Sequence, residues 1–181
     1  MRVLNVGGGP RNISLPSKYS GWEQVWLDID PACKPDIVLD ARKLPIQGQK
    51  FDAIYCSHNL EHYHRHDGLK VLRGFVLSLT PNGYAHIRVP DVGEVMQRFV
   101  RGQLDMESIL YHSPAGPIAV HDVFYGHGRQ IASSGKEYYA HKTGYTARLL
   151  GRMLGAAGFK MMEIAEKKDV VELEVFAYLK D

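Results

Sequence analysis

Short apolar runs alternate with apolar stripes at helical spacing along this chain. This alternation is typical of a parallel sheet whose strands are joined by crossover helices. Each run is brief, is rich in Val, Ile, Leu or aromatic residues, and is bounded by Gly, Pro, Asp or Asn. We therefore expect an α/β fold built on a Rossmann-like open sheet. The strands predicted before residue 90 are 2–6, 23–28, 36–40, 51–56 and 84–89.

The C-terminal end of the chain predicts an antiparallel hairpin. Residues 160–166 and 170–179 are two further strand-like runs, joined by 167–169. The second run places an apolar residue at every other position, which is the pattern of a strand with one buried face. The sheet should therefore be mostly parallel, with an antiparallel strand at its end.

Three helices are predicted from stripes and caps. The first helix carries Leu69, Leu72, Val76 and Leu79 and ends at a turn over 80–83. The second begins at Asp91, which forms a capping box with Glu94, and buries Val92, Val95, Met96 and Phe99. The third begins at the cap Thr146 and ends at Gly158.

The first three strands are connected by 7–22 and 29–35, which carry no helical stripe. Because these strands are apolar at successive positions, both of their faces need cover. We predict a reduced helix layer on one face of the sheet. That face would be buried by a second copy of the chain, forming a homodimer, or by residues 102–142 folding back onto it.

Residues 113–143 contain prolines and glycines and show little periodicity. Connections of this length are commonly lids or binding loops. We expect a single domain over 1–181, with a lid or substrate insertion at about 102–143.

Composition narrows the function classes. Twenty-two Lys and Arg residues against 20 Asp and Glu give a net charge of +2, too small and too scattered for a nucleic-acid surface. No apolar run approaches the ~20 residues that span a bilayer, and the N-terminal apolar stretch is too short for a signal peptide. We expect a cytoplasmic protein without membrane or nucleic-acid partners. Cys33 and Cys56 are too few and too far apart for a disulfide scaffold or a cysteine zinc site.

A glycine turn, Gly7, Gly8 and Gly9, directly follows the first predicted strand. Glycine lets a backbone approach a ligand where a side chain would collide. Asp28 follows at the end of the second strand, where a carboxylate can accept hydrogen bonds from ribose hydroxyls. Together they favour an adenosine ligand. NAD is the alternative, weakened because Asn12 replaces the third glycine of the dinucleotide fingerprint and Pro16 interrupts the helix that would hold a pyrophosphate.

Six motifs in order give a family resemblance. They are the glycine turn, Leu27–Pro31, Asp40–Pro45, Phe51–Asp52, Leu60–Glu61–His62 and Leu79–Gly83. Together they resemble the class I S-adenosylmethionine-dependent methyltransferases, specifically the compact bacterial ones. The resemblance covers 2–91 and resumes at 142–146 and at Gly158–Phe159.

The resemblance implies an S-adenosylmethionine cofactor and its binding residues. Gly7 and Gly9 would adjoin the methionine part, with Gly8 between them. Asp28, followed by Ile29, would hold the ribose; Asp40 would accept from the adenine amino group, and Ala41 would offer its backbone amide. Ser57 and His58 leave the fourth strand beside the sulfonium, at the edge where open α/β sheets bind ligands.

The run His58–His62 also matches H-x-x-E-H, a zinc-protease pattern. That pattern requires a helix, whereas this stretch leaves a strand and the next helix begins near Asp67. We therefore expect no metal. His62 occupies the family's Glu-His position and either braces the loop or contacts the substrate.

A second cluster of polar and aromatic residues lies within 121–142. His121 or His127 would be a general base, Asp122 would orient it, and Tyr125 would form a wall or donate a hydrogen bond. The alternative is that these amphipathic side chains only attach the loop to the domain.

The sequence thus predicts an S-adenosylmethionine-dependent methyltransferase acting on a small-molecule or sugar-like acceptor. Three alternatives stay open: an NAD-type oxidoreductase, an aminopropyl-type transferase that uses a related sulfonium, and a non-catalytic adenosine-binding partner subunit.

Overall fold

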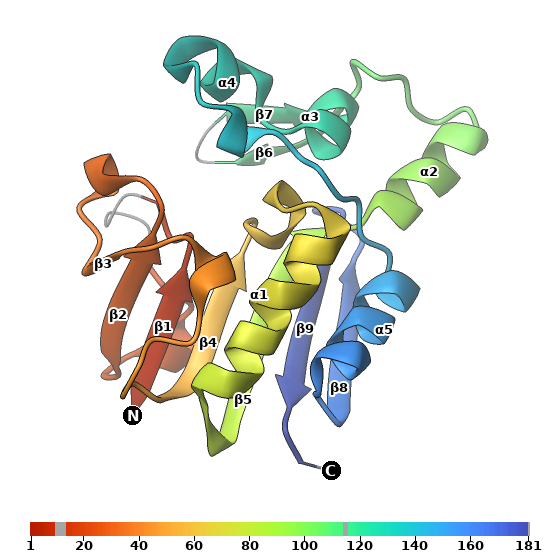
Figure 1. The fold of residues 1–181 in the computed structure, drawn as a ribbon. Helices are drawn as coiled ribbons and strands as arrows, with labels where there is room; N and C mark the ends of the chain where they lie inside the picture. The colour runs from red at the N-terminus through yellow and green to blue at the C-terminus, as the bar shows by residue number, and fades with distance from the viewer. Residues whose placement is uncertain (10–13, 114–115, 181) are drawn as a thin grey trace.

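A seven-stranded sheet forms the centre of the molecule (Figure 1). The computed structural model describes residues 1–9, 14–113 and 116–180. The strand order is β3-β2-β1-β4-β5-β9-β8; the first five are parallel, and β9 runs antiparallel to both of its neighbours. The predicted Rossmann-like open sheet with a C-terminal antiparallel hairpin is confirmed. The strands are β1 (Arg2–Val6), β2 (Glu23–Asp28), β3 (Ile37–Val38), β4 (Phe51–Ser57), β5 (Leu79–Pro90), β8 (Met161–Lys167) and β9 (Glu172–Tyr178).

Among the strands that differ from their predicted bounds are β3 and β5. β3 has two residues instead of the five predicted over 36–40, because both flanking aspartates bond elsewhere. Asp36 accepts a hydrogen bond from the Trp26 backbone N–H at 2.9 Å, and Asp40 caps the short helix η3 (Ala41–Lys43). The predicted turn over 80–83 lies inside β5, where the pairing with β4 shifts register.

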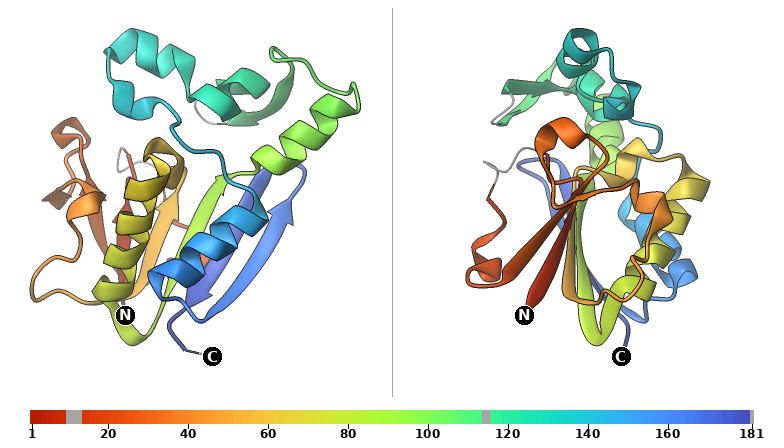
Figure 2. Two further views of the ribbon diagram at one scale, coloured as in Figure 1. Left: turned by 45° about the vertical axis from the view of Figure 1, so that its right-hand side comes forward. Right: turned by 60° about the vertical axis from the view of Figure 1, so that its left-hand side comes forward.

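Helices α1 (Arg65–Ser78) and α5 (Ala147–Ala157) pack side by side on one face of the sheet (Figure 2). They bury large apolar side chains such as Phe75 and Leu150 against the sheet. Burying each such side chain contributes about 1.5–3 kcal/mol. The predicted cap of α5 is present, since the Thr146 hydroxyl accepts from the Leu149 N–H at 3.2 Å.

The opposite face has the reduced helix layer that the sequence predicts. Among the residues that the structure describes, only the short helix η1 (Ser17–Tyr19) lies on it (Figure 2). Tyr19 is fully buried there against Val3 and Tyr55, with Leu15 and Trp22 packed around it. Cover on this face is therefore local.

The described residues within 102–142 do not fold back onto that face, so this part of the prediction is wrong. They form a second, two-stranded sheet with short helices beyond the C-terminal ends of the parallel strands (Figure 1). Val92 and Val95 hold it there through Val120 and Val123. Its elements are β6 (Ile109–Ser113), β7 (Gly116–Ala119), α3 (Val120–Tyr125), α4 (Gly128–Ser134) and η5 (Glu137–Tyr139).

Helix α2 (Val92–Val100) carries this assembly and projects from the main sheet (Figure 1). Because only its first turns meet the smaller sheet, Met96 and Phe99 are exposed, contrary to the prediction. Asp91 caps the helix as predicted, but Glu94 pairs with Arg98 instead of completing a capping box. In the part of the chain that the structure describes, no helix combines the length and apolar character needed to cross a membrane.

Candidate active site

A cavity of about 1160 Å³ lies at the C-terminal edge of the parallel strands, beneath the smaller sheet. Both sequence clusters contribute to its lining, from the glycine turn to residues 111–142. Parallel open sheets place their ligand sites at this edge. The predicted site residues that line the cavity are Gly7, Gly8, Gly9, Asp28, Ile29, Asp40, Ser57, His58, His62, Asp122 and His127.

The glycine turn exposes its backbone to the cavity. Gly7 and Gly9 have φ angles of 67° and 61°, in the left-handed region that favours glycine. A Cβ at Gly7 would overlap the Asn59 side chain, and one at Gly8 would overlap that of Asn5. The turn therefore requires glycine both for its conformation and for its close packing. Asn12, whose presence in place of a glycine argues against NAD, lies outside the described residues.

Asp28 is held at the end of β2 by two backbone groups. Its Oδ2 accepts from the Gly9 N–H at 3.1 Å, and its Oδ1 accepts from the Asp30 N–H at 2.9 Å. These bonds join the glycine turn to the loop after β2. The carboxylate is fixed within the cavity wall and retains acceptor capacity, because each oxygen has two lone pairs.

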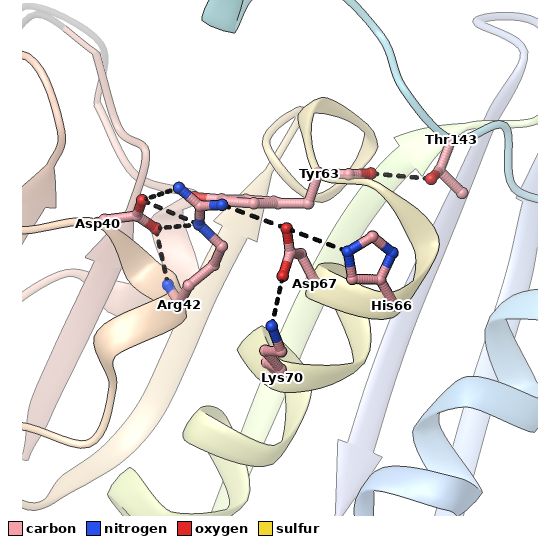
Figure 3. A network of polar contacts seen from close by, with 7 residues as sticks. All are labelled: Asp40, Arg42, Tyr63, His66, Asp67, Lys70 and Thr143. Carbon is pink, nitrogen blue, oxygen red and sulfur yellow. Dashed lines mark hydrogen bonds and ion pairs between the residues drawn. The ribbon is translucent and has the colours of Figure 1, made fainter.

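Asp40 belongs to a chain of charges shown in Figure 3. The Arg42 guanidinium binds it at 2.6 Å and also pairs with Asp67 at 3.2 Å, which pairs in turn with Lys70. The hydrogen bond from Arg42 holds the pKa of Asp40 below its usual range. The ring of Tyr63 extends toward this group (Figure 3). Asp40 is therefore ionised and already engaged on one side.

Ala41 follows Asp40 in η3 but is buried and does not line the cavity. The side chain of Asp40 thus reaches the cavity, while Ala41 packs into the core.

His58 turns the chain at the end of β4. Its φ is 47°, and its backbone N–H donates to the Arg88 carbonyl at 2.9 Å. Its ring Nε2 lies 2.8 Å from Glu172 Oε2, and Arg88 Nε donates to the other oxygen of Glu172 at 2.8 Å. Burial opposes the charged imidazole, but Glu172 and Glu61 raise the pKa of His58 to about 9. His58 is therefore a cation at neutral pH.

Glu61 is a buried carboxylate with unusual surroundings. Its side chain is 2% exposed, and neither oxygen has a hydrogen-bond partner within the described residues. Two ring nitrogens lie farther off: His58 Nδ1 at 3.5 Å and His141 Nε2 at 3.9 Å from Oε1. Burial opposes its charge, yet the imidazoles around it hold the pKa of Glu61 well below its usual range. The Glu61 anion thus faces the cationic His58 ring at 3.5 Å but accepts no hydrogen bond within the described residues.

The backbone brings His62 and His141 to this carboxylate. The Glu61 carbonyl accepts from the backbone N–H groups of Lys142 and Thr143, at 2.8 and 3.1 Å. The His62 and His141 rings meet edge to face with centroids 4.9 Å apart. Seventy-nine positions separate these histidines, so spacing along the sequence gives no sign of their contact.

Two of the predicted catalytic residues lie elsewhere. Tyr125 is 58% exposed, and His121 is exposed with its ring packed against that of Tyr125. Neither lines the cavity. Asp122 accepts from the Ala119 N–H at 2.9 Å, so it fixes the start of α3. Of the histidines in that segment that were predicted as bases, the structure brings only His127 to the cavity.

The segment above the sheet is attached to the loop after β2. Asp30 Oδ2 accepts from Lys136 Nζ at 2.6 Å and from the Tyr138 hydroxyl at 2.8 Å. These hydrogen bonds, with that from Lys136 foremost, lower the pKa of Asp30 to about 2. The contact connects two parts of the chain more than a hundred residues apart.

Sequence reasoning missed Arg88, Glu172 and Asn59. The alternation of β9 points Glu172 away from the main core, which is usually a solvated position. Glu172 is nevertheless 3% exposed, because Arg88 and His58 enclose it. Asn59 has a buried Oδ1 without a partner in the described residues. Its place after the fourth strand, beside Ser57 and His58, was the one available signal.

Comparison with known proteins shows a family match and similar solved structures. Residues 1–164 match the methyltransferase domain family. A SAM-dependent methyltransferase from Methanosarcina mazei matches at 13% identity and TM-score 0.60, covering 99% of this chain and 93% of that one. The glycopeptide N-methyltransferase MtfA, complexed with S-adenosylmethionine, matches at 12% identity and TM-score 0.63, with coverages of 99% and 87%. Among curated proteins, none matches significantly.

Other matched structures are much longer than this chain. The citrinin polyketide synthase CMeT domain matches at 13% identity and TM-score 0.61 over all of this chain and 47% of its own length. This chain thus spans about half the length of some structures that it matches. The similarity to solved structures shows the fold, and the family match shows the family to which the chain belongs. The chain belongs to the methyltransferase domain family.

Proposed function

We propose that this chain transfers the methyl group of S-adenosylmethionine to a small-molecule acceptor bound in the cavity. The observation that carries the proposal is the continuity of that cavity. It joins the glycine turn and Asp28 to a polar region around His58 and Glu172. Ligand pockets usually measure about 300–1000 Å³. A volume of about 1160 Å³ leaves room for a cofactor and a small acceptor together.

The residues at the glycine turn fit the cofactor. A backbone that admits no Cβ at Gly7 or Gly8 suits close approach by a ligand. The orphaned buried Oδ1 of Asn59 can accept from a ligand ammonium group, since its place beside Gly7 puts it at the methionine end. S-adenosylmethionine supplies an electrophilic methyl group on a sulfonium.

Asp28 would accept from the ribose hydroxyls, with Ile29 packing beside it. Asp40 would accept from the adenine amino group with the acceptor capacity that Arg42 leaves. The side chain of Asp40 lines the cavity, whereas Ala41 would act only through its backbone. Ser57 and His58 would face the reacting end, because they leave β4 at the sheet edge.

The other half of the cavity would hold the acceptor. Its wall carries a cation, His58, and the paired charges Arg88 and Glu172. A fixed polar wall of this kind orients a hydroxyl- or amine-bearing molecule by hydrogen bonds, including a sugar-like one. Methyl transfer is an in-line displacement, so alignment of the acceptor and exclusion of water do most of the work.

A general base is needed only when the acceptor carries a proton on the reacting atom. We assign that role to His127, which lines the cavity at the start of α4. His62 is a weaker candidate, because its Nδ1 lies 3.1 Å from the Ala140 carbonyl and its ring packs on His141. Tyr125 and His121 take no part, since both are exposed outside the cavity.

Residues 102–143 would act as a lid over the acceptor. They lie across the open edge of the sheet (Figure 1) and attach to Asp30 through Lys136 and Tyr138. Release of this contact would open the cavity for exchange of ligands. The single-domain organisation over 1–181, a homodimer, a cytoplasmic location and the absence of a nucleic-acid partner stay predictions.

Calorimetry and turnover together test the proposal. S-adenosylhomocysteine should bind with 1:1 stoichiometry, and NAD should give no heat above dilution. Label from methyl-labelled S-adenosylmethionine should then move to at least one hydroxyl- or amine-bearing compound in a panel. The variant His127→Gln should lower turnover more for hydroxyl acceptors than for amines. Preference for NAD would support the oxidoreductase alternative, and cofactor binding without transfer would support a partner subunit.

A further inference from the structure

We propose that Glu61, His62 and His141 form a binding site for a divalent transition-metal ion, with zinc as its probe. One ligand atom from each of the three residues lies within 4.8 Å of the other two. Two imidazoles and a carboxylate are a ligand set typical of zinc and neighbouring first-row metals. The inference concerns metal binding and does not depend on the methyl-transfer proposal.

The carboxylate of Glu61 is buried without a hydrogen bond from any described residue. Glu61 is 1% exposed, and neither side-chain oxygen has a hydrogen-bond partner in the part of the chain described. Buried charged groups are nearly always paired, hydrogen-bonded or bound to a metal. His58 Nδ1, at 3.5 Å, is the closer of two imidazole nitrogens, and the other ring nitrogen of His58 is bonded to Glu172. The Glu61 oxygens therefore keep lone pairs that a cation can use.

Backbone carbonyls orient both histidine rings. His62 Nδ1 lies 3.1 Å from the Ala140 carbonyl, and His141 Nδ1 lies 2.8 Å from the Val123 carbonyl. Because a carbonyl only accepts, each Nδ1 carries the proton and each Nε2 has a lone pair. Metal-binding histidines typically donate their second nitrogen to a carbonyl in this way, which fixes the tautomer and the ring. His141 Nε2 indeed faces Glu61, at 3.9 Å from Oε1.

Backbone hydrogen bonds join the three ligands. Glu61 and His62 are adjacent in the short helix η4 (Leu60–His62). Residues 142 and 143 bond to the Glu61 carbonyl and so hold His141 beside them. The three ligands need only close by a fraction of their present separation to meet an ion at metal-ligand distance.

The site differs from the zinc-protease pattern in the sequence. In that pattern both histidines lie on one helix, whereas here His58 is turned toward Glu172 and the second histidine comes from residue 141. All three ligands also line the large cavity. With three protein ligands, a fourth position stays open to water or to an oxygen or nitrogen atom of a bound molecule.

The test is metal titration of the full chain after treatment with a chelator. Zn²⁺ should bind 1:1 by calorimetry, and Co²⁺ should give the visible absorption of a four-coordinate ion. The variants Glu61→Gln and His141→Gln should each weaken Zn²⁺ binding at least about 100-fold, since loss of an outer-shell partner alone costs 10–100-fold.

The matched control is His66→Gln, which removes an exposed imidazole that stacks on His64 outside the cluster. It should bind Zn²⁺ as the wild type does. The spectrum of Co²⁺ in the unmodified protein keeps the test valid if a variant misfolds. The proposal fails if the wild type binds neither ion stoichiometrically, or if Glu61→Gln and His141→Gln bind Zn²⁺ as tightly as His66→Gln. Binding of S-adenosylhomocysteine by the metal-free protein, measured separately, tests the proposed function alone.

Discussion

The carboxylate of Asp28 accepts a hydrogen bond from the backbone N–H of Gly9 at 3.1 Å, so one side chain joins the ends of β1 and β2. Asp28 also accepts from the Asp30 N–H at 2.9 Å, which leaves its remaining lone pairs for a ligand. This arrangement makes the two predicted cofactor elements a single unit.

Replacement of Asp28 should therefore weaken cofactor binding. For Asp28→Ala we expect a loss of about 1–3 kcal/mol in the binding of S-adenosylhomocysteine, roughly 5- to 150-fold in Kd, the usual range for a charged hydrogen bond. The control is Glu23→Gln, which neutralises an exposed carboxylate at the far end of the same strand. Calorimetric affinities that are equal in wild type and Asp28→Ala would remove the ribose assignment.

The two cysteines should react at very different rates. Cys33 is partly exposed and lines the cavity, whereas Cys56 is fully buried, and burial raises the pKa of both thiols. Since a reagent must also reach the thiol, it should label Cys33 alone in the folded protein. S-adenosylhomocysteine should slow this labelling, as followed by mass spectrometry. Labelling of Cys33 at the same rate with saturating ligand would place the ligand elsewhere.

Loss of the Tyr138 hydroxyl should loosen the segment over the cavity. Tyr138→Phe removes one bond to Asp30, and a contact of about 0.5–1 kcal/mol corresponds to roughly two- to five-fold faster amide exchange. Hydrogen exchange of residues 128–139 measures the effect. Tyr139→Phe is the matched control, because its hydroxyl has no hydrogen-bond partner in the described part of the chain. Equal exchange in the two variants would show that the Asp30 contact does not hold the segment.

His86 should make stability depend on pH. Burial lowers the pKa of His86 to about 4, against about 6.5 in an unfolded chain. Between these values the unfolded state binds a proton that the folded state does not. The contribution of His86 to the free energy of unfolding should then be fully present above about pH 6.5. Below that pH the free energy of unfolding should fall by about 1.4 kcal/mol per pH unit.

Urea unfolding at several pH values measures this slope. The neutral variant His86→Gln can still accept from Tyr19 and donate to Glu174, which bond the ring at 3.1 and 3.0 Å. It should lose the slope between pH 6.5 and 4. The same slope in this variant would assign the dependence to other groups.

The fold was predictable because its signals are local. Apolar runs and their flanking turn residues placed β1, β2 and β4 within a residue of their ends, and Thr146 marked the start of α5. Where polar residues bind across the sheet, local patterns mislead. β3 is short because Asp36 and Asp40 bond elsewhere, and Phe99 is exposed because α2 leaves the main core.

Of the cavity lining, the sequence allowed prediction mainly of the residues next to strand ends, for the same reason. The glycine turn and Asp28 lie next to strand ends, so their place in the cavity follows from the topology. The pairing of His58 with Glu172 and the meeting of Glu61 with His141 join residues 114 and 80 positions apart, respectively. Such contacts depend on the packed fold and leave no periodic trace in the sequence.

A crystal structure of the chain soaked with S-adenosylhomocysteine tests the central claim most directly. We predict density for the ligand in the cavity, with its ribose on Asp28, its adenine toward Asp40 and its amino acid end against Gly7 and Gly9. An empty cavity in crystals where the ligand binds elsewhere would contradict the account and leave the family likeness as one of fold.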